Sequence, residues 1–234
     1  MKAMFLRIGI DKGTDGALGP ILEDGSFEYI PISEGDSQSK EDRTYKNTIG
    51  RSGKPLSTYL PKQIENRTIH FDPEFTTFTY GDPTSKRSYL LKLKTGDLLV
   101  FYAGLTPYQN KKYETALYII GYFLIEQVID FNILSKRSIE DYHNTLPNNA
   151  HLKRSYDTTD LVMIVGDKNR SKLLNKAIKI SQLKLDKLGK PYHAVSKEME
   201  RLLGISGSIQ RSIPPRLIYE QKHVINLKKI LGMK

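Results

Sequence analysis

The sequence predicts an α+β protein: an N-terminal β-barrel or mixed sheet with a helical, basic C-terminal portion packed on it. The first half carries short apolar runs separated by glycine, proline and aspartate turns, which is typical of strands. The second half carries longer segments whose apolar residues recur at helical spacing. With 234 residues and 38% apolar content, the chain is long enough for one large or two small cores.

The N-terminal elements are predicted to be short strands joined by turns. Residues 4–10 read MFLRIGI and indicate a first strand, because this short apolar run meets Asp11 with no small-residue cleavage site of the kind that ends a signal peptide. Asp24 and Gly25 lie between apolar runs, as in a tight hairpin. The polar segment 33–62 predicts a long loop, and loops of this length are usually functional covers or disordered.

The clearest element is a central hairpin. The apolar runs Leu98–Tyr102 and Ala116–Phe123 flank a polar, basic connection, and the second run continues through LIEQVIDF. Both runs indicate strands, because a helix would need a longer periodic segment and would tolerate the glycines poorly. We interpret this hairpin mainly as scaffold, with its aromatic ends and basic tip lining a site.

Beyond Lys136 the chain is predicted to be mainly helical. SIEDYHNT indicates a short helix, and LVMIVGD a strand buried on both faces. Residues 168–190 indicate a longer helix, because Leu173, Ala177 and Ile180 follow i, i+4, i+7 spacing. Further helices are predicted in SKEMERLLG, where Ser196 is a suitable cap, and in YEQKHVINLKKILG.

This pattern predicts two portions packed as one compact unit, with residues 1–135 β-rich and residues 136–234 α-rich. Charge divides the chain in a similar way. Residues 1–150 hold 18 Lys and Arg against 19 Asp and Glu, whereas residues 151–234 hold 18 against 7. A net charge of +10 concentrated in this way suggests a polyanion, with Lys172, Lys176 and Lys179 contacting a nucleic-acid backbone. The alternative is a lysine-rich solvated surface.

The residue composition indicates the cellular environment and the kinds of site that we expect. There is no cysteine, which excludes disulfides and thiolate metal sites and suggests a cytoplasmic location. No apolar run approaches the roughly 18 residues that a membrane-spanning helix needs, so we expect no membrane partner. His143 and His151 are separated by eight residues on a predicted loop, and this spacing is weak evidence for a metal site.

A predicted strand-to-helix junction, GDKNRS, offers a phosphate site. A helix N-terminus carries unpaired N–H groups and a partial positive charge, and both attract anions. Gly166 would let the backbone approach, while Arg170 and Ser171 would hold the phosphate beside Asp167. The alternative is that Asp167 only caps the helix.

Several turns carry groups suited to acid–base chemistry or base recognition. Asp11 and Lys12 follow the first strand, and Asp11 would act as a base only if burial shifted its pKa. Asp72, Tyr80 and Asp82 lie in HFDPEF and TYGD, where the alternative role is turn formation before proline. An asparagine such as Asn149 suits the edge of a base, and an exposed tyrosine such as Tyr102 could stack one.

Two resemblances to known families sharpen these interpretations. GDLLVFYAG followed by LYIIGYFLIEQVIDF resembles the central hairpin of PUA-like barrels, including the EVE and ASCH groups, which tend to bind nucleic acid or modified bases at the barrel mouth. Over most of the chain, the order of motifs is closer to the third nucleotide-modification-associated domain family. The motifs are GIDKGTDGALGPILEDGSFEYIPI, FDPEF, TYGD, TGDLLVFYAG, NNAHLKR and VGDKNRSKLL.

The second resemblance implies a substrate class, namely nucleic-acid bases in hypermodification or processing, rather than a reaction. The positions that carry the family motifs over to this chain are Asp11, Asp72, Tyr80, Gly81, Asp82, Asn149, His151, Gly166, Asp167 and Ser171.

The leading hypothesis is therefore a protein that recognises a nucleotide or a nucleic-acid base, and the sequence leaves open whether it is an enzyme. Asp11, Asp82 and His151 are the predicted catalytic groups. The predicted nucleotide- or base-binding residues are Lys12, Asp72, Tyr80, Gly81, Tyr102 and Asn149. The alternatives are a non-catalytic nucleic-acid reader and a structural or partner-binding protein. No cofactor fingerprint is recognised, and no metal is expected.

Overall fold

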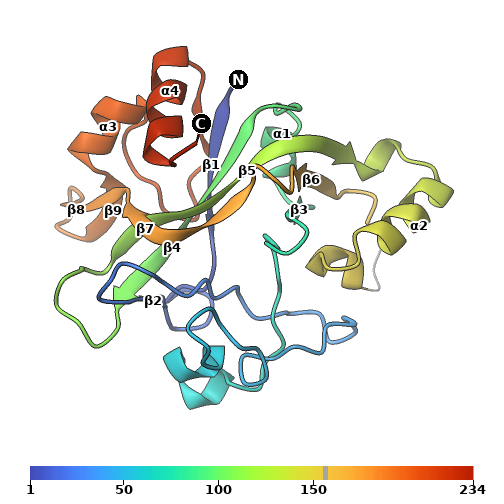
Figure 1. The fold of residues 1–234 in the computed structure, drawn as a ribbon, viewed down its shortest axis with the longest axis horizontal. Coiled ribbons are helices and arrows are strands. Elements are labelled where there is room, and N and C mark those ends of the chain that lie inside the picture. Colours follow the sequence, from blue (N-terminus) through green and yellow to red (C-terminus); the bar gives the residue numbers. More distant parts are fainter. Residues whose placement is uncertain (155–157, 234) are drawn as a thin grey trace.

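The sheet is built around the predicted hairpin. The computed structural model describes residues 1–154 and 158–233, and Figure 1 shows two long strands crossing its centre. These are β4 (Leu98–Pro107) and β5 (Ala116–Asp130), which pair antiparallel. Their apolar runs are continuous because both faces of the sheet are covered here: most side chains from Leu98 to Ile125 in the two strands are buried. The hairpin prediction is confirmed.

Three strands extend the sheet on the β4 side. β1 (Ala3–Ile8) lies parallel to the first half of β4, and β2 (Gly19–Ile21) lies parallel to its last residues. β10 (Arg216–Ile218) pairs antiparallel with β1. The N-terminal run predicted as a strand is thus confirmed, and it occupies an interior position in the sheet.

Three other strands extend the β5 side. β6 (Val162–Gly166) and β7 (Lys172–Lys179) both pair antiparallel with β5, and β3 (Thr79–Asp82) pairs antiparallel with β6. Within the described ranges, the strand order β10-β1-β4-β5-β6-β3 has two free ends. The sheet is therefore open and mixed. The mixed-sheet alternative is confirmed, and the closed barrel is not formed.

Residues 168–190 do not form the predicted helix. They contain β7 and then β8 (Ser181–Leu185), which forms a two-stranded sheet with β9 (Pro191–Val195). The i, i+4, i+7 spacing of apolar residues is overridden because β7 completes its backbone hydrogen bonding on β5. Among its described residues, the C-terminal portion carries five strands, β6 to β10, beside the predicted shorter helices. Three of these strands pair with strands of the first portion.

The other helices occur where the sequence predicts them. Figure 1 shows α3 (Lys197–Leu203) and α4 (Gln221–Ile230) together at one end of the sheet, and α2 (Lys136–Thr145) at the other. The Ser196 Oγ accepts a hydrogen bond from the backbone N–H of Met199, as expected of an N-cap. Across the described residues, no helix is both long and apolar enough to cross a membrane. A further short helix, α1, covers Arg87–Leu90.

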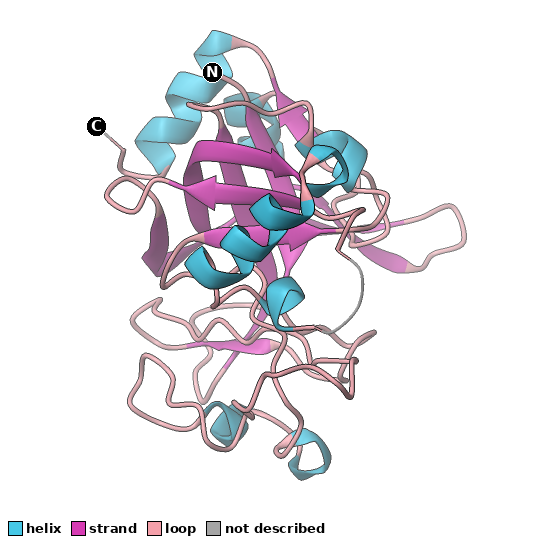
Figure 2. Ribbon diagram, turned by 90° about the vertical axis from the view of Figure 1, so that its right-hand side faces the viewer, coloured by secondary structure: helices cyan, strands magenta, loops and turns pink. Residues whose placement is uncertain are grey.

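The N-terminal loops pack around a small core of their own. Figure 2 shows this loop-rich layer below the sheet, with short 3-10 turns such as η1 (Leu56–Tyr59) and η2 (Lys62–Ile64). The Tyr45 side chain is fully buried in it, and its hydroxyl donates to the Pro31 carbonyl at 2.9 Å. The predicted loop 33–62 is thus packed, and the chain leaves it toward β3. The core residues are Ile10, Ile30, Tyr45, Leu56, Ile64 and Ile69.

Candidate functional site

A polar cleft of about 240 Å³ lies where the loop layer meets the sheet. Residues 70–72 leave the loop layer, β3 follows, and η4 (Ala150–Lys153) closes one side. The lining combines buried acid–base groups with basic side chains. These are His70, Asp72, Asp82 and His151, together with Arg7, Lys86, Arg154 and Arg211.

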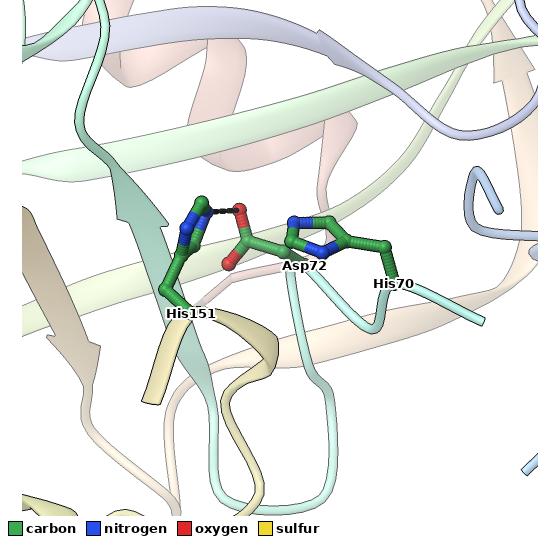
Figure 3. Close-up of side chains that lie close together, drawn as sticks. All are labelled: His70, Asp72 and His151. Carbon is green, nitrogen blue, oxygen red and sulfur yellow. Dashed lines mark ion pairs between the residues drawn. The ribbon is translucent and has the colours of Figure 1, made fainter. Parts of the chain in front are cut away.

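Asn149 holds the Asp72–His151 pair in place. As N-cap of η4, its Oδ1 accepts a hydrogen bond from the His151 backbone N–H at 2.9 Å, and its Nδ2 donates to Asp72 Oδ1 at 3.1 Å. Asp72 Oδ1 also accepts from the Gly81 N–H at 2.8 Å. The second oxygen, Oδ2, lies 3.5 Å from His151 Nε2, the contact dashed in Figure 3. One carboxylate oxygen is therefore fixed and the other faces the imidazole.

Gly81 is required by the close approach of η4 to β3. A Cβ at this position would lie 2.8 Å from His151 Cδ2 and 3.0 Å from Leu161 Cδ1. The absence of a side chain lets the imidazole sit directly over the strand. The family-motif residue Gly81 thus has a packing role beside the catalytic candidate.

His70 lies on the other side of Asp72. Its Nδ1 is 2.8 Å from Glu34 Oε2, and Glu34 also pairs with Arg154 Nη2 at 2.6 Å. Burial raises the pKa of Glu34, but the bonds from His70 and Arg154 outweigh it and lower the pKa to about 2. The His70 and His151 rings meet edge to face, 4.8 Å apart. His70, Asp72 and His151 each offer a ligand atom, and these atoms lie within 4.8 Å of one another.

Asp82, at the end of β3, is held by its neighbours. Its Oδ1 accepts from the Thr84 N–H at 2.7 Å, and its Oδ2 accepts from the Tyr80 hydroxyl at 3.1 Å. Lys86 Nζ lies 3.7 Å from the same Oδ2. Burial raises the pKa of Tyr80 well above its usual value, so the phenol stays neutral as a donor. This arrangement suits a carboxylate that accepts a proton or a hydrogen bond from a ligand in the cleft.

Arg7 lines the cleft, and its hydrogen bonding is incomplete. It is the one charged residue within β1, and its side chain is only 14% exposed. Among the described residues its buried Nε has no hydrogen-bond partner, and its Nη2 forms an ion pair with Asp11 Oδ2 at 3.6 Å. Burial lowers the pKa of Arg7, which Asp11 opposes. An arginine stays protonated in proteins, so the cleft contains a buried cation whose N–H groups can still donate hydrogen bonds to a ligand.

Asp11 lies in an adjoining cleft of about 510 Å³, and Arg7 and Arg211 line both. Asp11 Oδ1 accepts from the Gly13 and Thr14 N–H groups, and Oδ2 accepts from Arg211 Nε at 2.7 Å. Burial raises the pKa of Asp11, but Arg211 outweighs it, so the pKa lies below its usual value. The structure thus brings Asp82 and His151 together and leaves Asp11 behind the two arginines. Lys12 is exposed beside Asp11.

A family model matches most of the chain. The model described as Nucleotide modification associated domain 3 matches residues 2–201, which include every cleft residue except Arg211. The chain belongs to this family. Its name associates it with nucleotide modification. Searches of curated proteins and of solved structures found no match.

Two residues predicted to contact a base lie inside the protein. Asn149, a family-motif residue, is fully buried, and its amide bonds Asp72, Thr79 and the His151 backbone. Tyr102 is 4% exposed, and its hydroxyl donates to the Ile209 carbonyl at 3.0 Å, while burial raises its pKa to about 12. Neither side chain presents a free edge or face to a base. Both act by holding other groups.

The predicted phosphate junction is a turn between two strands. Residues 166–171 join β6 to β7, so neither an anion-binding helix N-terminus nor a helix cap exists there. Asp167 accepts hydrogen bonds from the Asn169 and Arg170 N–H groups and pairs with the Arg170 side chain at 2.7 Å. The Ser171 Oγ accepts from the Leu124 N–H. Farther along β7, exposed lysines lie at the positions predicted to contact a nucleic-acid backbone, namely Lys172, Lys176 and Lys179.

Sequence reasoning missed four residues of this region: Arg7, Glu34, Arg154 and Arg211. Arg7 did leave a signal, because it interrupts an otherwise apolar strand of the sequence MFLRIGI. A charged side chain in a buried strand is energetically costly, so its presence marks a position with a specific role. Arg154 closes the quoted motif NNAHLKR but was not singled out. Glu34 and Arg211 left no signal, since each comes from a polar stretch and reaches the site only through long-range folding.

Proposed function

We propose that this chain binds the anionic group of a nucleotide or of a nucleic-acid strand at Arg7, and holds the adjoining nucleoside beside Asp82 and His151 in a base-modification pathway. The observation that carries the proposal is the bonding state of Arg7. Membership of the Nucleotide modification associated domain 3 family supports the substrate class.

A buried cation without a hydrogen-bond acceptor destabilises a protein, since desolvating an ion costs several kcal/mol unless a partner compensates. Arg7 is 14% exposed, and its Nε is buried with no partner among the described residues. A phosphate oxygen would supply that partner, and guanidinium groups bind phosphate through paired, charge-assisted hydrogen bonds. Arg211 lines the same cleft and already bonds Asp11, so it helps to keep Arg7 pointed at the ligand.

Other residues that line the cleft suit a nucleoside. Asp82 accepts hydrogen bonds and is held by Tyr80, and the Asp72–His151 pair can hold or move a proton. In this proposal the exposed lysines of β7 follow a nucleic-acid backbone, and the protein works in the cytoplasm.

The test is calorimetric titration of the full chain, in the presence of EDTA, with deoxynucleoside 5′-monophosphates, the matching nucleosides and a short single-stranded oligonucleotide. Arg7→Met is compared with Arg170→Met, which removes an exposed arginine from the β6–β7 turn. We expect Arg7→Met to weaken phosphate-bearing ligands by about tenfold or more, because a charged hydrogen bond contributes roughly 1.5–3 kcal/mol. Arg170→Met should change affinity by less than about twofold.

Wild-type protein that binds none of these ligands would contradict the proposal. So would an Arg7→Met protein, folded by circular dichroism, that binds them as wild type does. If Arg170→Met lost as much affinity for these ligands as Arg7→Met, the phosphate site would have to be assigned to the β6–β7 turn.

A further inference from the structure

Three side chains in the cleft have the composition of a metal site. His70 and Asp72 come from the segment before β3, and His151 comes from η4. In the view of Figure 3 the Asp72 carboxylate lies between the two imidazole rings. Their ligand atoms lie within 4.8 Å of one another, and all three side chains are buried, with at most 8% exposed. We infer that His70, Asp72 and His151 bind a divalent transition-metal ion.

The hydrogen bonds around these groups prepare them as ligands. His70 Nδ1 lies 2.8 Å from Glu34 Oε2 and 3.1 Å from Arg154 Nη2. In the tautomer that donates from Nδ1 to Glu34, the Nε2 lone pair of His70 is left for an ion. Asp72 is fixed in the same way: Oδ1 accepts two hydrogen bonds, from Gly81 and Asn149, and Oδ2 is directed at His151. Metal-binding histidines and carboxylates are usually oriented by such outer partners.

The donor set selects a class of ion. Two imidazoles and one carboxylate suit Zn²⁺, Fe²⁺ or a neighbouring transition ion, whereas Mg²⁺ and Ca²⁺ prefer oxygen ligands. Bonds of about 2.1 Å would draw the ligand atoms to roughly 3–4 Å from one another, a contraction that side-chain rotation can supply. Three protein ligands also leave at least one coordination position for water or a ligand oxygen, as in catalytic sites.

The charged side chains around these three ligands affect how tightly a metal ion binds. Arg154 neutralises Glu34, and Arg7, Lys86 and Arg211 also line the cleft, so the basic side chains oppose a second cation. Asp72 and Asp82 offset two of those charges. An ion held by His70, Asp72 and His151 would lie in the same cleft as Arg7 and would favour the same anionic ligand. The metal inference rests on the ligand geometry alone and stands without the proposed function.

The experiment measures the metal directly, with no nucleotide present. The full chain is stripped with EDTA, dialysed and titrated with Zn²⁺ by calorimetry, and with Co²⁺ by visible absorption. We expect about one ion per chain, with a dissociation constant below about 1 μM. Asp72→Asn and His151→Gln should weaken binding by about 100-fold or more, and Glu34→Gln by about 10- to 100-fold. The matched control is His223→Gln on α4, outside the cleft, for which we expect less than about a twofold change.

Each variant is checked for folding by circular dichroism in EDTA. Because Asp72→Asn removes a buried group, the Co²⁺ spectrum of Glu34→Gln provides a second test in a protein whose ligands are all intact. A wild-type chain that binds no stoichiometric Zn²⁺ or Co²⁺ would overturn the inference. Binding that survives in both Asp72→Asn and His151→Gln, or that His223→Gln weakens equally, would overturn it too. Since the nucleotide titrations contain EDTA, either idea can fail alone.

Discussion

The β6–β7 turn and the cleft beside Arg7 carry similar side chains in different bonding states. In the turn, Arg170 is 68% exposed and pairs with Asp167, which also accepts two backbone hydrogen bonds. In the cleft, Arg7 is 14% exposed, and its buried Nε has no hydrogen-bond partner among the described residues. The side chains of the turn complete one another's hydrogen bonds, whereas the hydrogen bonding of Arg7 in the cleft stays incomplete.

The difference shows why charge and glycine are weak markers of an anion site. An exposed ion pair contributes about 0–1 kcal/mol and is found on many surfaces. A buried, incompletely bonded cation is costly, so it persists only where the surrounding fold holds it or where a ligand completes its bonding. Burial and bonding therefore separate the two regions, although their composition in the sequence is alike.

The largest effect is expected from Asn149→Ala in the cleft. Removing the amide leaves Asp72, Thr79 and the His151 N–H each short of a buried hydrogen bond, so the free energy of unfolding should fall by about 3 kcal/mol. Denaturant titration measures this change. The matched control is Asn169→Ala in the exposed β6–β7 turn, which should stay within about 0.5 kcal/mol of wild type. If Asn149→Ala and Asn169→Ala lowered the free energy of unfolding equally, the cleft and the turn would not differ in the way described.

Much of the fold follows from local pattern. The β4–β5 hairpin, β1, β6 and the helices α3 and α4 were predictable because each has a continuous apolar run or a capped amphipathic period. The segment that became β7 and β8 was not. Its lysines and apolar residues fit a helix locally, and only pairing with β5, about fifty residues earlier, decides for a strand.

The site was predictable only in part, for the same reason. Asp82 and His151 stand in recognisable motifs and do share a cleft. Glu34 and Arg154 meet across 120 residues of chain, and Arg211 reaches Asp11 across 200, so no local pattern could pair them. His70 lies two residues from Asp72, yet the histidine in contact with that carboxylate is His151.

A smaller, pH-dependent effect is expected from Glu34→Gln. The pKa of Glu34 is lowered from 4.5 to about 2 in the folded protein, so its ionised form stabilises the fold fully above about pH 4.5. This contribution is lost as the pH falls toward 2. Glu34→Gln should therefore cost about 2 kcal/mol at pH 7, from the charged bonds to His70 and Arg154, and progressively less below pH 4.5.

Urea titrations from pH 7 to pH 3 follow this loss. The comparison variant is Asp167→Asn in the turn, where the pKa is also lowered, by an Arg170 side chain that is 68% exposed. Its effect should be smaller than that of Glu34→Gln and should change little between pH 7 and pH 3, because solvent screens the pair. A cost for Glu34→Gln that does not change with pH would contradict the coupling of Glu34 to His70 and Arg154.

The central claim is that Arg7 is kept buried for a ligand and not for the fold, and the stability of Arg7→Met without ligand tests it most directly. Methionine keeps the apolar stem and removes the buried charge with its 3.6 Å ion pair to Asp11, while Asp11 retains its bond to Arg211. The account predicts a free energy of unfolding about 1 kcal/mol above wild type by denaturant titration. A less stable Arg7→Met protein would show that Arg7 serves the fold, and would contradict it.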